Sequence, residues 1–303
     1  MTETARIAAE GLESDAGMGG QPVLDRLVGL LDLEQVEENI FRGVSPAQSP
    51  VRVFGGQVAG QALVAAGRTV PEERDVHSLH AYFIRGGDPR VPIVYEVDRI
   101  RDGRSFTTRR VVAVQHGKAI FSLSASFQKA EQGIEHSEPM PDVPDPETLP
   151  TLAERAAGYE EQLGAHVMPR PIDLRYVNEP PWITRDEDAP SPERNQVWMR
   201  ADGVLPDQPL LHVCVLTYAS DMTLLDSVLA RHGVYWEMDK VLGASLDHAL
   251  WFHRPFRADE WFLYDSSSPS ASGSRGLATG RFFAADGTMI ATVVQEGLLR
   301  VLD

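Results

Sequence analysis

The sequence predicts an α+β protein in which one unit, made of a helix and a set of antiparallel strands, occurs twice. Segments with helical and strand-like patterns follow the same order in both halves of the 303-residue chain: helix, strand, strand and then a hairpin. The hairpin turn is at residues 116–118 in the first copy and at residues 286–288 in the second. This spacing is too long for a solenoid repeat, so we predict a duplicated domain.

The first copy is predicted to span residues 23–128. Residues 1–22 are rich in Gly, Ala and Glu and lack apolar periodicity, which is typical of a disordered tail. Apolar residues at helical spacing occupy residues 22–33, and a strand-like alternation follows them. The small residues of 55–70 favour a central helix lying close to a curved antiparallel sheet, and a glycine-rich surface loop is the alternative. Strands are expected at residues 77–85, 93–100, 105–115 and 119–127.

The two copies are joined by residues 129–171, which are acidic and rich in proline and are predicted to form a linker. One short helix is expected within it, near residues 152–163. The second copy is predicted to span residues 172–303. Its helix is expected to begin at Ser220 and Asp221, because Ser is a common N-cap residue and an apolar-periodic run follows. Strands are expected at residues 172–177, 196–200, 244–253, 261–266, 276–284 and 289–298.

Composition excludes several classes of function. With 43% hydrophobic residues, the chain can bury a large core. Its formal net charge of −16 argues against nucleic acid or an anionic membrane as the main partner, although a local basic patch can still bind a small anion. The single cysteine, Cys214, cannot form an internal disulfide or a cysteine-based zinc site. No apolar run approaches the roughly 18 residues of a membrane span, and no signal-peptide pattern is present, so we expect a cytoplasmic protein.

Familiar catalytic and ligand-binding motifs are missing. Residues 55–60 contain adjacent glycines but have neither the spacing nor the strand–helix context of a dinucleotide-binding loop. The sequence has no Walker loop, no HExxH zinc motif and no GxSxG nucleophile elbow. His77 and His80 lie three residues apart in a predicted strand, so they point to opposite faces and are expected to be structural. No metal site is therefore predicted.

Three polar residues of the second copy are the candidates for chemistry. A carboxylate at Asp221, beside the free N–H groups of a helix end, could hold or deprotonate a water molecule. An aspartate at a helix start is also common for structural reasons alone, and Ser245 and Gln295 could simply bond to neighbouring strands. These residues by themselves leave both interpretations open.

Comparison of the two copies favours the catalytic interpretation. When the hairpin turns are aligned, Gln295 lies opposite Ala125. When the preceding strands are aligned on their histidines, Ser245 lies opposite His77, and Asp221 falls opposite the start of the glycine-rich helix, which has no acid. The second copy alone therefore carries a carboxylate, a hydroxyl and an amide. A site that is retained on one side of a pseudo-twofold axis explains this asymmetry.

Several long stretches of the chain resemble the acyl-CoA thioesterase II (TesB-like) family. The similar stretches are residues 53–63, 77–83 and 101–111 in the first copy and residues 218–221, 246–256 and 293–297 in the second. They occur in the same order and cover nearly everything from about residue 30 to residue 298. The resemblance implies a double hotdog fold: two tandem units form one continuous curved antiparallel sheet around two central helices. Here those helices are expected at residues 55–70 and 221–231, side by side and antiparallel.

The resemblance also implies hydrolysis of acyl-CoA to a free acid and CoA, without a metal or an organic cofactor, with Asp221, Ser245 and Gln295 as the catalytic residues. We expect Asp221 to act as a general base while the other two orient the water. Direct attack by Asp221 through an anhydride is the alternative. Backbone N–H groups of Gly56 or Gln57 in the first copy could receive the developing oxyanion.

Further expectations concern binding and assembly. The expected partners are acyl-CoA and further copies of the chain, in a homo-oligomer such as a dimer or a tetramer, and the expected role is in fatty acid metabolism. Candidates for the CoA phosphates are Arg101, Arg104, Arg109 and Arg110. Two other functions stay open: an acyl-thioester hydratase of hotdog type, for which no His–Asp pair is evident, and a non-catalytic acyl-CoA-binding protein, which would not need the three polar residues.

Overall fold

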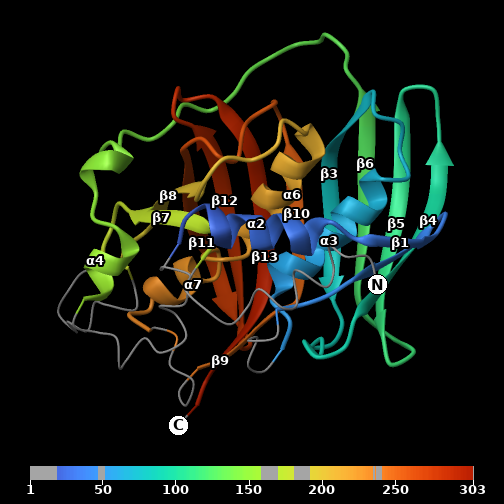
Figure 1. Cartoon of the computed structure of the whole chain (residues 1–303). Helices are drawn as coiled ribbons and strands as arrows, with labels where there is room; N and C mark the ends of the chain where they lie inside the picture. Colours follow the sequence, from blue (N-terminus) through green and yellow to red (C-terminus); the bar gives the residue numbers. More distant parts are fainter. Residues whose placement is uncertain are drawn as a thin grey trace.

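The computed structural model describes residues 19–46, 52–157, 170–180, 192–234, 236 and 241–302 (Figure 1). Residues 1–18 of the predicted tail and the second half of the predicted linker helix lie outside the described residues. The helix expected at the start of the first copy is α2 (Gln21–Leu31), whose leucines Leu24, Leu27 and Leu31 are buried in the core. Its apolar face, spaced as in an amphipathic helix, is the reason that the sequence pattern identified it.

The strands of the described chain form one antiparallel sheet. In the first half they are β1 (Glu34–Glu37), β2 (Ile40–Gly43), β3 (Arg74–Phe83), β4 (Ile93–Asp102), β5 (Phe106–Gln115) and β6 (Lys118–Lys129). In the second half they are β7 (Ile172–Tyr176), β8 (Asn195–Ala201), β9 (Val241–Ser245), β10 (Asp247–Phe252), β11 (Phe262–Ser272), β12 (Arg275–Ala284) and β13 (Met289–Val301). The sheet runs in the order β1-β2-β4-β5-β6-β3-β10-β13-β12-β11-β8-β7, and β9 pairs with β13 beside this path.

The two halves of the sheet have the same strand order when they are followed outward from the centre. The first half reads β3-β6-β5-β4-β2-β1 and the second reads β10-β13-β12-β11-β8-β7. They are joined by β3 and β10, which pair antiparallel with Leu79 opposite Leu250. The sheet is therefore continuous across the junction, as Figure 1 shows. This confirms the predicted duplication and the predicted double hotdog architecture.

Two buried helices, one from each half, pack together inside the sheet. They are α3 (Gly55–Gly67) and α6 (Pro209–Ser220). They run antiparallel, because Gly56 of α3 faces the carbonyl oxygen of Tyr218 while Gly67, at the other end of α3, faces Leu210. The predicted glycine-rich helix is thus α3. The predicted position of its partner is wrong: residues 221–231 hold only the short helix α7 (Asp226–Ala230), and the central helix lies before Asp221.

Helix α6 was not predicted, because it is apolar on nearly every side. Its sequence, PLLHVCVLTYAS, has no polar face, since α3 and the sheet surround it. A helix of this kind lacks the 3.6-residue periodicity by which helices are recognised. The usable signal was Pro209, which occupies the first turn, where proline is favoured because its missing N–H needs no partner.

The segment between the two halves packs against the second half. Helices η1 (Pro146–Thr148) and α4 (Leu152–Ala156) lie in it. The indole N–H of Trp198 donates to the carbonyl of Pro144 at 2.9 Å, and the indole N–H of Trp261 donates to Glu147 at 2.9 Å. Met140 and its neighbours cover a small apolar cluster on the outer face of the sheet. This part of the linker therefore covers β8, β11 and β12.

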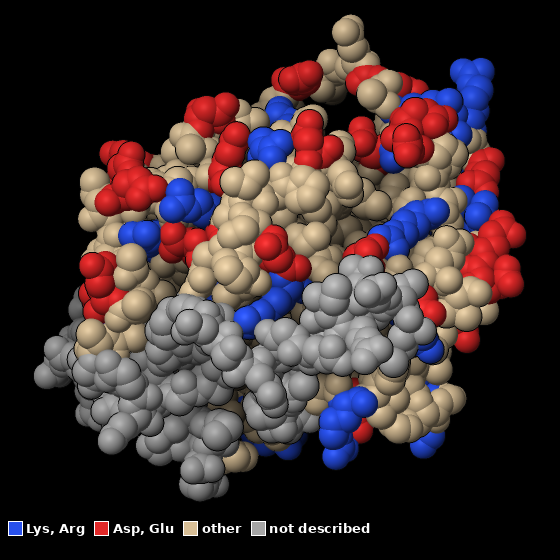
Figure 2. Space-filling view, in the orientation of Figure 1, with Lys and Arg blue, Asp and Glu red and all other residues tan. Residues whose placement is uncertain are grey.

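On the face drawn in Figure 2, acidic and basic side chains are interspersed over the described residues, without a large patch of one charge. Among the residues that the structure describes, no helix has the length and apolar character needed to cross a membrane.

Candidate active site

Asp221 lies at the end of the central helix pair where the C-terminus of α6 is beside the N-terminus of α3. It is the C-cap residue of α6, and the antiparallel packing places it beside the N-terminus of α3. A Cβ atom added to Gly55 would lie 2.6 Å from the Asp221 Oδ2 atom, and one added to Gly56 would lie 2.4 Å from the Tyr218 carbonyl oxygen. Only glycine therefore allows this approach.

The predicted local geometry of Asp221 is wrong in one respect. Ser220 is not an N-cap: it is the last residue of α6, is fully buried, and places its Oγ atom 2.8 Å from the Thr217 carbonyl oxygen. The helix N-terminus that faces Asp221 belongs to α3 of the first half, and the Gly56 N–H there opposes the rise in the pKa of the Asp221 carboxyl. The two halves therefore share the site: the second supplies the acid and the first supplies the helix end.

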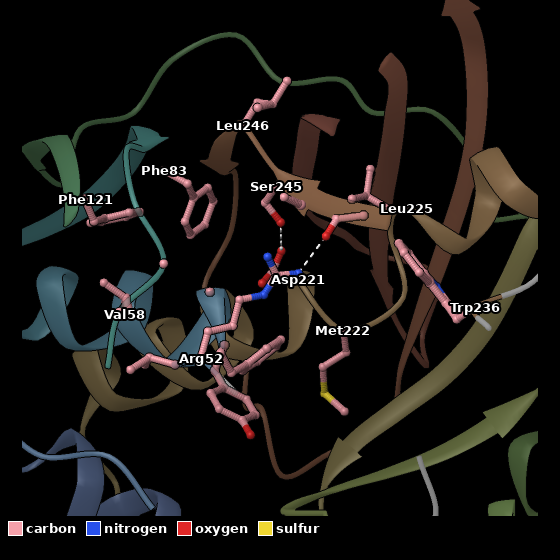
Figure 3. Close-up of a pocket in the computed structure, with 18 of the residues that line it drawn as sticks. Arg52, Val58, Phe83, Phe121, Asp221, Met222, Leu225, Trp236, Ser245 and Leu246 are labelled. Atoms are coloured by element: carbon pink, nitrogen blue, oxygen red, sulfur yellow. Dashed lines mark hydrogen bonds between the residues drawn. The ribbon is translucent and has the colours of Figure 1, made fainter. Parts of the chain in front are cut away.

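Three elements bring the candidate polar side chains together. Ser245 is the last residue of β9, and Gln295 lies in β13, where it is fully buried. The Gln295 Nε2 amide donates to Asp221 Oδ1 at 2.8 Å, and the Ser245 hydroxyl donates to the same oxygen at 3.3 Å. Figure 3 shows Ser245 directed at Asp221. One carboxylate oxygen thus receives both side-chain donors.

The surroundings of Asp221 make its carboxyl group a stronger base than an exposed aspartate. Burial raises the pKa of Asp221 from its ordinary value of 3.8 to about 6, while the donors from Gln295, Gly56 and Ser245 and the positive charge of Arg52 oppose the rise. A carboxylate with a pKa near 6 is ionised at neutral pH and takes a proton more readily than an ordinary one. This combination suits a general base.

Asp221 and Ser245 line a cavity of about 700 Å³ between the two halves. Its walls are mainly apolar: Figure 3 shows Phe83, Phe121 and Val58 on one side of Asp221 and Met222, Leu225 and Trp236 on the other. A cavity of this volume with few polar groups is typical of a site for a small molecule with a large apolar part.

Three arginines also line this cavity: Arg52, Arg85 and Arg170. Arg52 donates to the Gly243 carbonyl at 2.6 Å, and Arg85 donates to the Ala119 carbonyl at 2.6 Å, so backbone oxygens orient both guanidinium groups. These arginines were not predicted, because nothing in their spacing relates them to Asp221.

The arginines that the sequence suggested for phosphate binding do not line this cavity. Arg109 is 1% exposed, and its guanidinium is bonded to Asp102 at 2.6 Å and to Thr69 at 2.9 Å. It is a buried structural residue, so its assignment to CoA is wrong. Arg110 is exposed and pairs with Asp98 at 2.9 Å. Both lie in β5 of the first half, and neither lines the cavity.

A second buried carboxyl group lines the same cavity. Asp226 is 6% exposed and accepts a hydrogen bond from the Trp236 indole N–H at 2.6 Å. Burial raises the pKa of Asp226 to about 7. Asp226 was not predicted, because no sequence motif relates it to Trp236.

The residues suggested for the oxyanion lie in the first turn of α3. The Gly56 N–H is directed at Asp221, and the Gln57 side chain is buried, with its amide donating to Ser45 Oγ at 2.9 Å. Helix positions of this kind leave backbone N–H groups free of intrahelical partners. Their role toward an oxyanion stays a prediction.

The first half has different residues at the corresponding positions. Register within the sheet sets Gly297 opposite Ser245 and, in the first half, Phe127 opposite Val76, so Val76 is the counterpart of Ser245. The alignment of His80 with His248, which made His77 the counterpart, is therefore one residue out. His80 lies opposite Ser124 and Ala249 lies opposite Val294, so register makes Ala249, and not His248, the counterpart of His80.

The helix ends give the counterpart of Asp221. Arg68 is the C-cap of α3, as Asp221 is the C-cap of α6. At the three corresponding positions the first half has Arg68, Val76 and Ala125. It therefore lacks an acid, a hydroxyl and an amide there. Among the described residues, no cluster of His, Cys, Asp and Glu could hold a metal ion.

Two family models match the chain. One, described as acyl-CoA thioesterase, covers residues 170–298, and the other, described as the N-terminal domain of acyl-CoA thioesterases, covers residues 44–128. The human protein named acyl-coenzyme A thioesterase 8 is 42% identical over 287 residues, which make up 90% of this chain and 88% of that protein.

Solved structures agree with these matches. A crystal structure of an acyl-CoA thioesterase II from Mycobacterium marinum is 48% identical and has a TM-score of 0.75, with 91% of this chain and 98% of that chain covered. A protein of unknown function with a hot dog fold from Alicyclobacillus acidocaldarius is 20% identical with a TM-score of 0.73 over 90% of this chain and 97% of that one, a likeness of fold alone. By identity and coverage, this chain belongs to the acyl-CoA thioesterase family.

Proposed function

We propose that this protein hydrolyses acyl-CoA thioesters to the free carboxylic acid and CoA. One observation carries the proposal: an aspartate with a raised pKa lies at an apolar cavity and accepts hydrogen bonds from an amide at 2.8 Å and a hydroxyl at 3.3 Å. Family membership supports the same reaction.

In the proposed mechanism, Asp221 is the general base. It removes a proton from a water molecule while the water oxygen bonds to the thioester carbonyl carbon, and Ser245 and Gln295 orient Asp221 and the water. The carbonyl oxygen becomes an oxyanion, which N–H groups at the start of α3, from Gly56 or Gln57, are suited to receive. Collapse of the tetrahedral intermediate breaks the carbon–sulfur bond. The thiolate takes the proton from Asp221, which restores the base.

The walls of the cavity suit the two parts of an acyl-CoA. Phe83, Phe121 and their apolar neighbours suit the acyl chain, and Arg52, Arg85 and Arg170 supply positive charge for phosphates. The formal charge of −16 for the whole chain makes this local positive charge important for an anionic substrate.

Three finer points belong to the same proposal. We place the enzyme in the cytoplasm, in fatty acid metabolism, and assembled as a homo-oligomer. The alternatives are an acyl-thioester hydratase, a non-catalytic acyl-CoA-binding protein, and, for the mechanism, direct attack by Asp221 with an anhydride intermediate. Ser245 and Gln295 both donate to the Oδ1 atom of Asp221, so the Oδ2 atom is the one left for either role.

The test is a hydrolysis assay of the full chain with short-, medium- and long-chain acyl-CoAs, in which released CoA is read with a thiol reagent. Cys214 is fully buried, and burial raises the pKa of its thiol, so the native protein should add little background. We expect turnover, one productive site per chain in a titration with a slowly hydrolysed analogue, and no loss of activity with EDTA. Hydration of an enoyl-CoA without CoA release, or binding without turnover, would overturn the proposal in favour of the respective alternative.

A further inference from the structure

A second cavity lies in the first half, at the place that corresponds to the active site. It has a volume of about 400 Å³, and the residues at the C-terminal end of α3, Arg68, Thr69 and Val70, line it. The active-site cavity is lined in the same way by Asp221 and Met222 at the C-terminal end of α6. Because α3 and α6 run antiparallel, the two cavities lie at opposite ends of α3, about 20 Å apart along its axis. They are therefore separate sites.

The second cavity carries positive charge. Its charged lining consists of four arginines and one aspartate: Arg68, Arg74, Arg99, Arg109 and Asp102. Arg101 adds a guanidinium group nearby, since a Cβ atom added to the lining residue Gly103 would lie 3.0 Å from Arg101 Nε. The C-terminal end of α3 contributes only about half a negative charge. In a chain with a formal charge of −16, this is a local basic patch of the kind that binds a small anion.

Two of the four guanidinium groups are used for structure. Arg109 is 1% exposed and donates to Asp102 at 2.6 Å. Arg68 donates to Asp32 at 2.6 Å and to the Leu33 carbonyl oxygen at 2.6 Å. These bonds hold the wall of the cavity in place, and both charges are already paired.

Arg74 and Arg99 keep donors for a ligand. Arg99 is 38% exposed and pairs at 3.2 Å with Glu38, which is more exposed still, so the pair contributes little in water. Arg74 forms no ion pair with a described residue, because the Thr107 hydroxyl and the Arg104 carbonyl oxygen, to which it donates, are neutral. A guanidinium group has five N–H donors, so both arginines can form further bonds.

Asp102 reports that these charges converge on one place. Its pKa is lowered by the bond from Arg109 and by the positive charges of Arg109, Arg99 and Arg74, although burial opposes the shift. The three arginines come from three different strands: Arg74 from β3, Arg99 from β4 and Arg109 from β5. A second anion beside Asp102 would meet the same positive charges.

We propose that the second cavity is a binding site for the phosphate group of a small molecule. Arg74 and Arg99 donate to the phosphate oxygens, which guanidinium groups match in geometry and in charge. The volume of about 400 Å³ leaves room for an organic group attached to the phosphate. The site is separate from the cavity at which the thioester is hydrolysed, so the proposal does not depend on the proposed function.

The test is calorimetric titration of the full chain at low salt, with inorganic phosphate and separately with ADP. We expect saturable binding of one equivalent per chain, which weakens as the salt concentration rises. Arg74→Gln and Arg99→Gln should each weaken it about tenfold or more. Because Arg99 is exposed, its variant tests the site even if Arg74→Gln destabilises the fold. Arg110→Gln is the matched control: Arg110 is also an exposed arginine, on β5, but does not line the cavity, so its loss should leave the affinity unchanged.

The two probes identify the source of the phosphate group. Equal affinities mean that the cavity takes free phosphate, tighter binding of ADP means that it takes an organic phosphate, and either result supports the site. Absence of saturable binding by the wild type would overturn the proposal, as would an equal loss in Arg110→Gln, which reports charge alone. Arg52→Gln is titrated alongside, because Arg52 lines the active-site cavity. Binding that is lost in Arg52→Gln but kept in Arg74→Gln and Arg99→Gln would place the phosphate at the active site instead.

Discussion

The two halves of the molecule share their strand order and central helix, and they differ in what they bury at one place. In the second half, Gln295 in β13 lies opposite the small Ala278 in β12. In the first half the sizes are exchanged: Ala125 in β6 lies opposite the large Arg109 in β5. The arrangement in the second half directs an amide at the carboxylate of Asp221.

This exchange shows how a duplicated fold can carry one site. Arg109 is buried because Asp102 and Thr69 satisfy its guanidinium, so the first half is stabilised by a closed set of bonds. In the second half, Gln295 and Ser245 bond to Asp221, and Asp221 still lines an open cavity. The first half still takes part, because the Gly56 N–H and the wall formed by Phe83 belong to it. Neither half has a complete site alone.

The strongest test of this difference is Asp221→Asn. An amide keeps the shape of the side chain but cannot accept the proton, so kcat should fall by about 10²–10⁴-fold. The matched control is Arg68→Gln, at the corresponding helix end of the first half, which should leave kcat near the wild-type value. Equal losses in the two variants would contradict the one-sided site. Circular dichroism checks that both remain folded.

Exchanging the residues at positions 295 and 125 gives the next largest effect. Gln295→Ala makes the second half resemble the first and should lower kcat by about 10- to 100-fold without a matching rise in KM. Ala125→Gln should create no activity and should lower the free energy of unfolding by about 1–3 kcal/mol, because it buries an amide without a partner beside Arg109. Recovery of activity when both changes are combined would show that the halves are interchangeable.

The dependence of kcat/KM on pH should report Asp221. Its pKa is raised to about 6, so the folded enzyme holds the proton up to that pH and gains the base only above it. Activity should therefore fall about tenfold per pH unit below pH 6 and level off above it. Gln295 donates to the ionised carboxylate, so Gln295→Ala should raise the pH below which activity falls. A fall in activity that begins only near pH 4 would contradict the burial of Asp221.

The smallest effect is expected at Ser245. Its bond to Asp221 is long, at 3.3 Å, and a long bond contributes little. Ser245→Val, which copies Val76 of the first half, should lower kcat a few-fold, while Ser245→Thr should keep most of the activity because it retains the hydroxyl. A loss in Ser245→Val as large as that in Asp221→Asn would mean that the hydroxyl has a chemical role of its own.

The sequence alone determined the features that depend on local patterns and on repetition. The hairpin strands and the glycine-rich helix α3 were predicted because their turns, alternation and small residues are local signals. The duplication was visible in the order of these segments. The same comparison singled out Asp221, Ser245 and Gln295, since a polar residue in only one of two copies stands out without any coordinates.

Only the tertiary structure decided the features that depend on distant neighbours. Helix α6 has no polar face because other elements surround it, so its position could not be predicted from periodicity. For the same reason the sequence did not show that Asp221 lies at the C-terminus of a helix and not at the N-terminus. Sheet register makes Ala249 the counterpart of His80, so the alignment of the copies on their histidines was one residue out. The partners that satisfy Arg109 come from the neighbouring strand β4, at Asp102, and from Thr69 in the loop after α3. Register is set by the packing of the whole sheet, which no local stretch of sequence encodes.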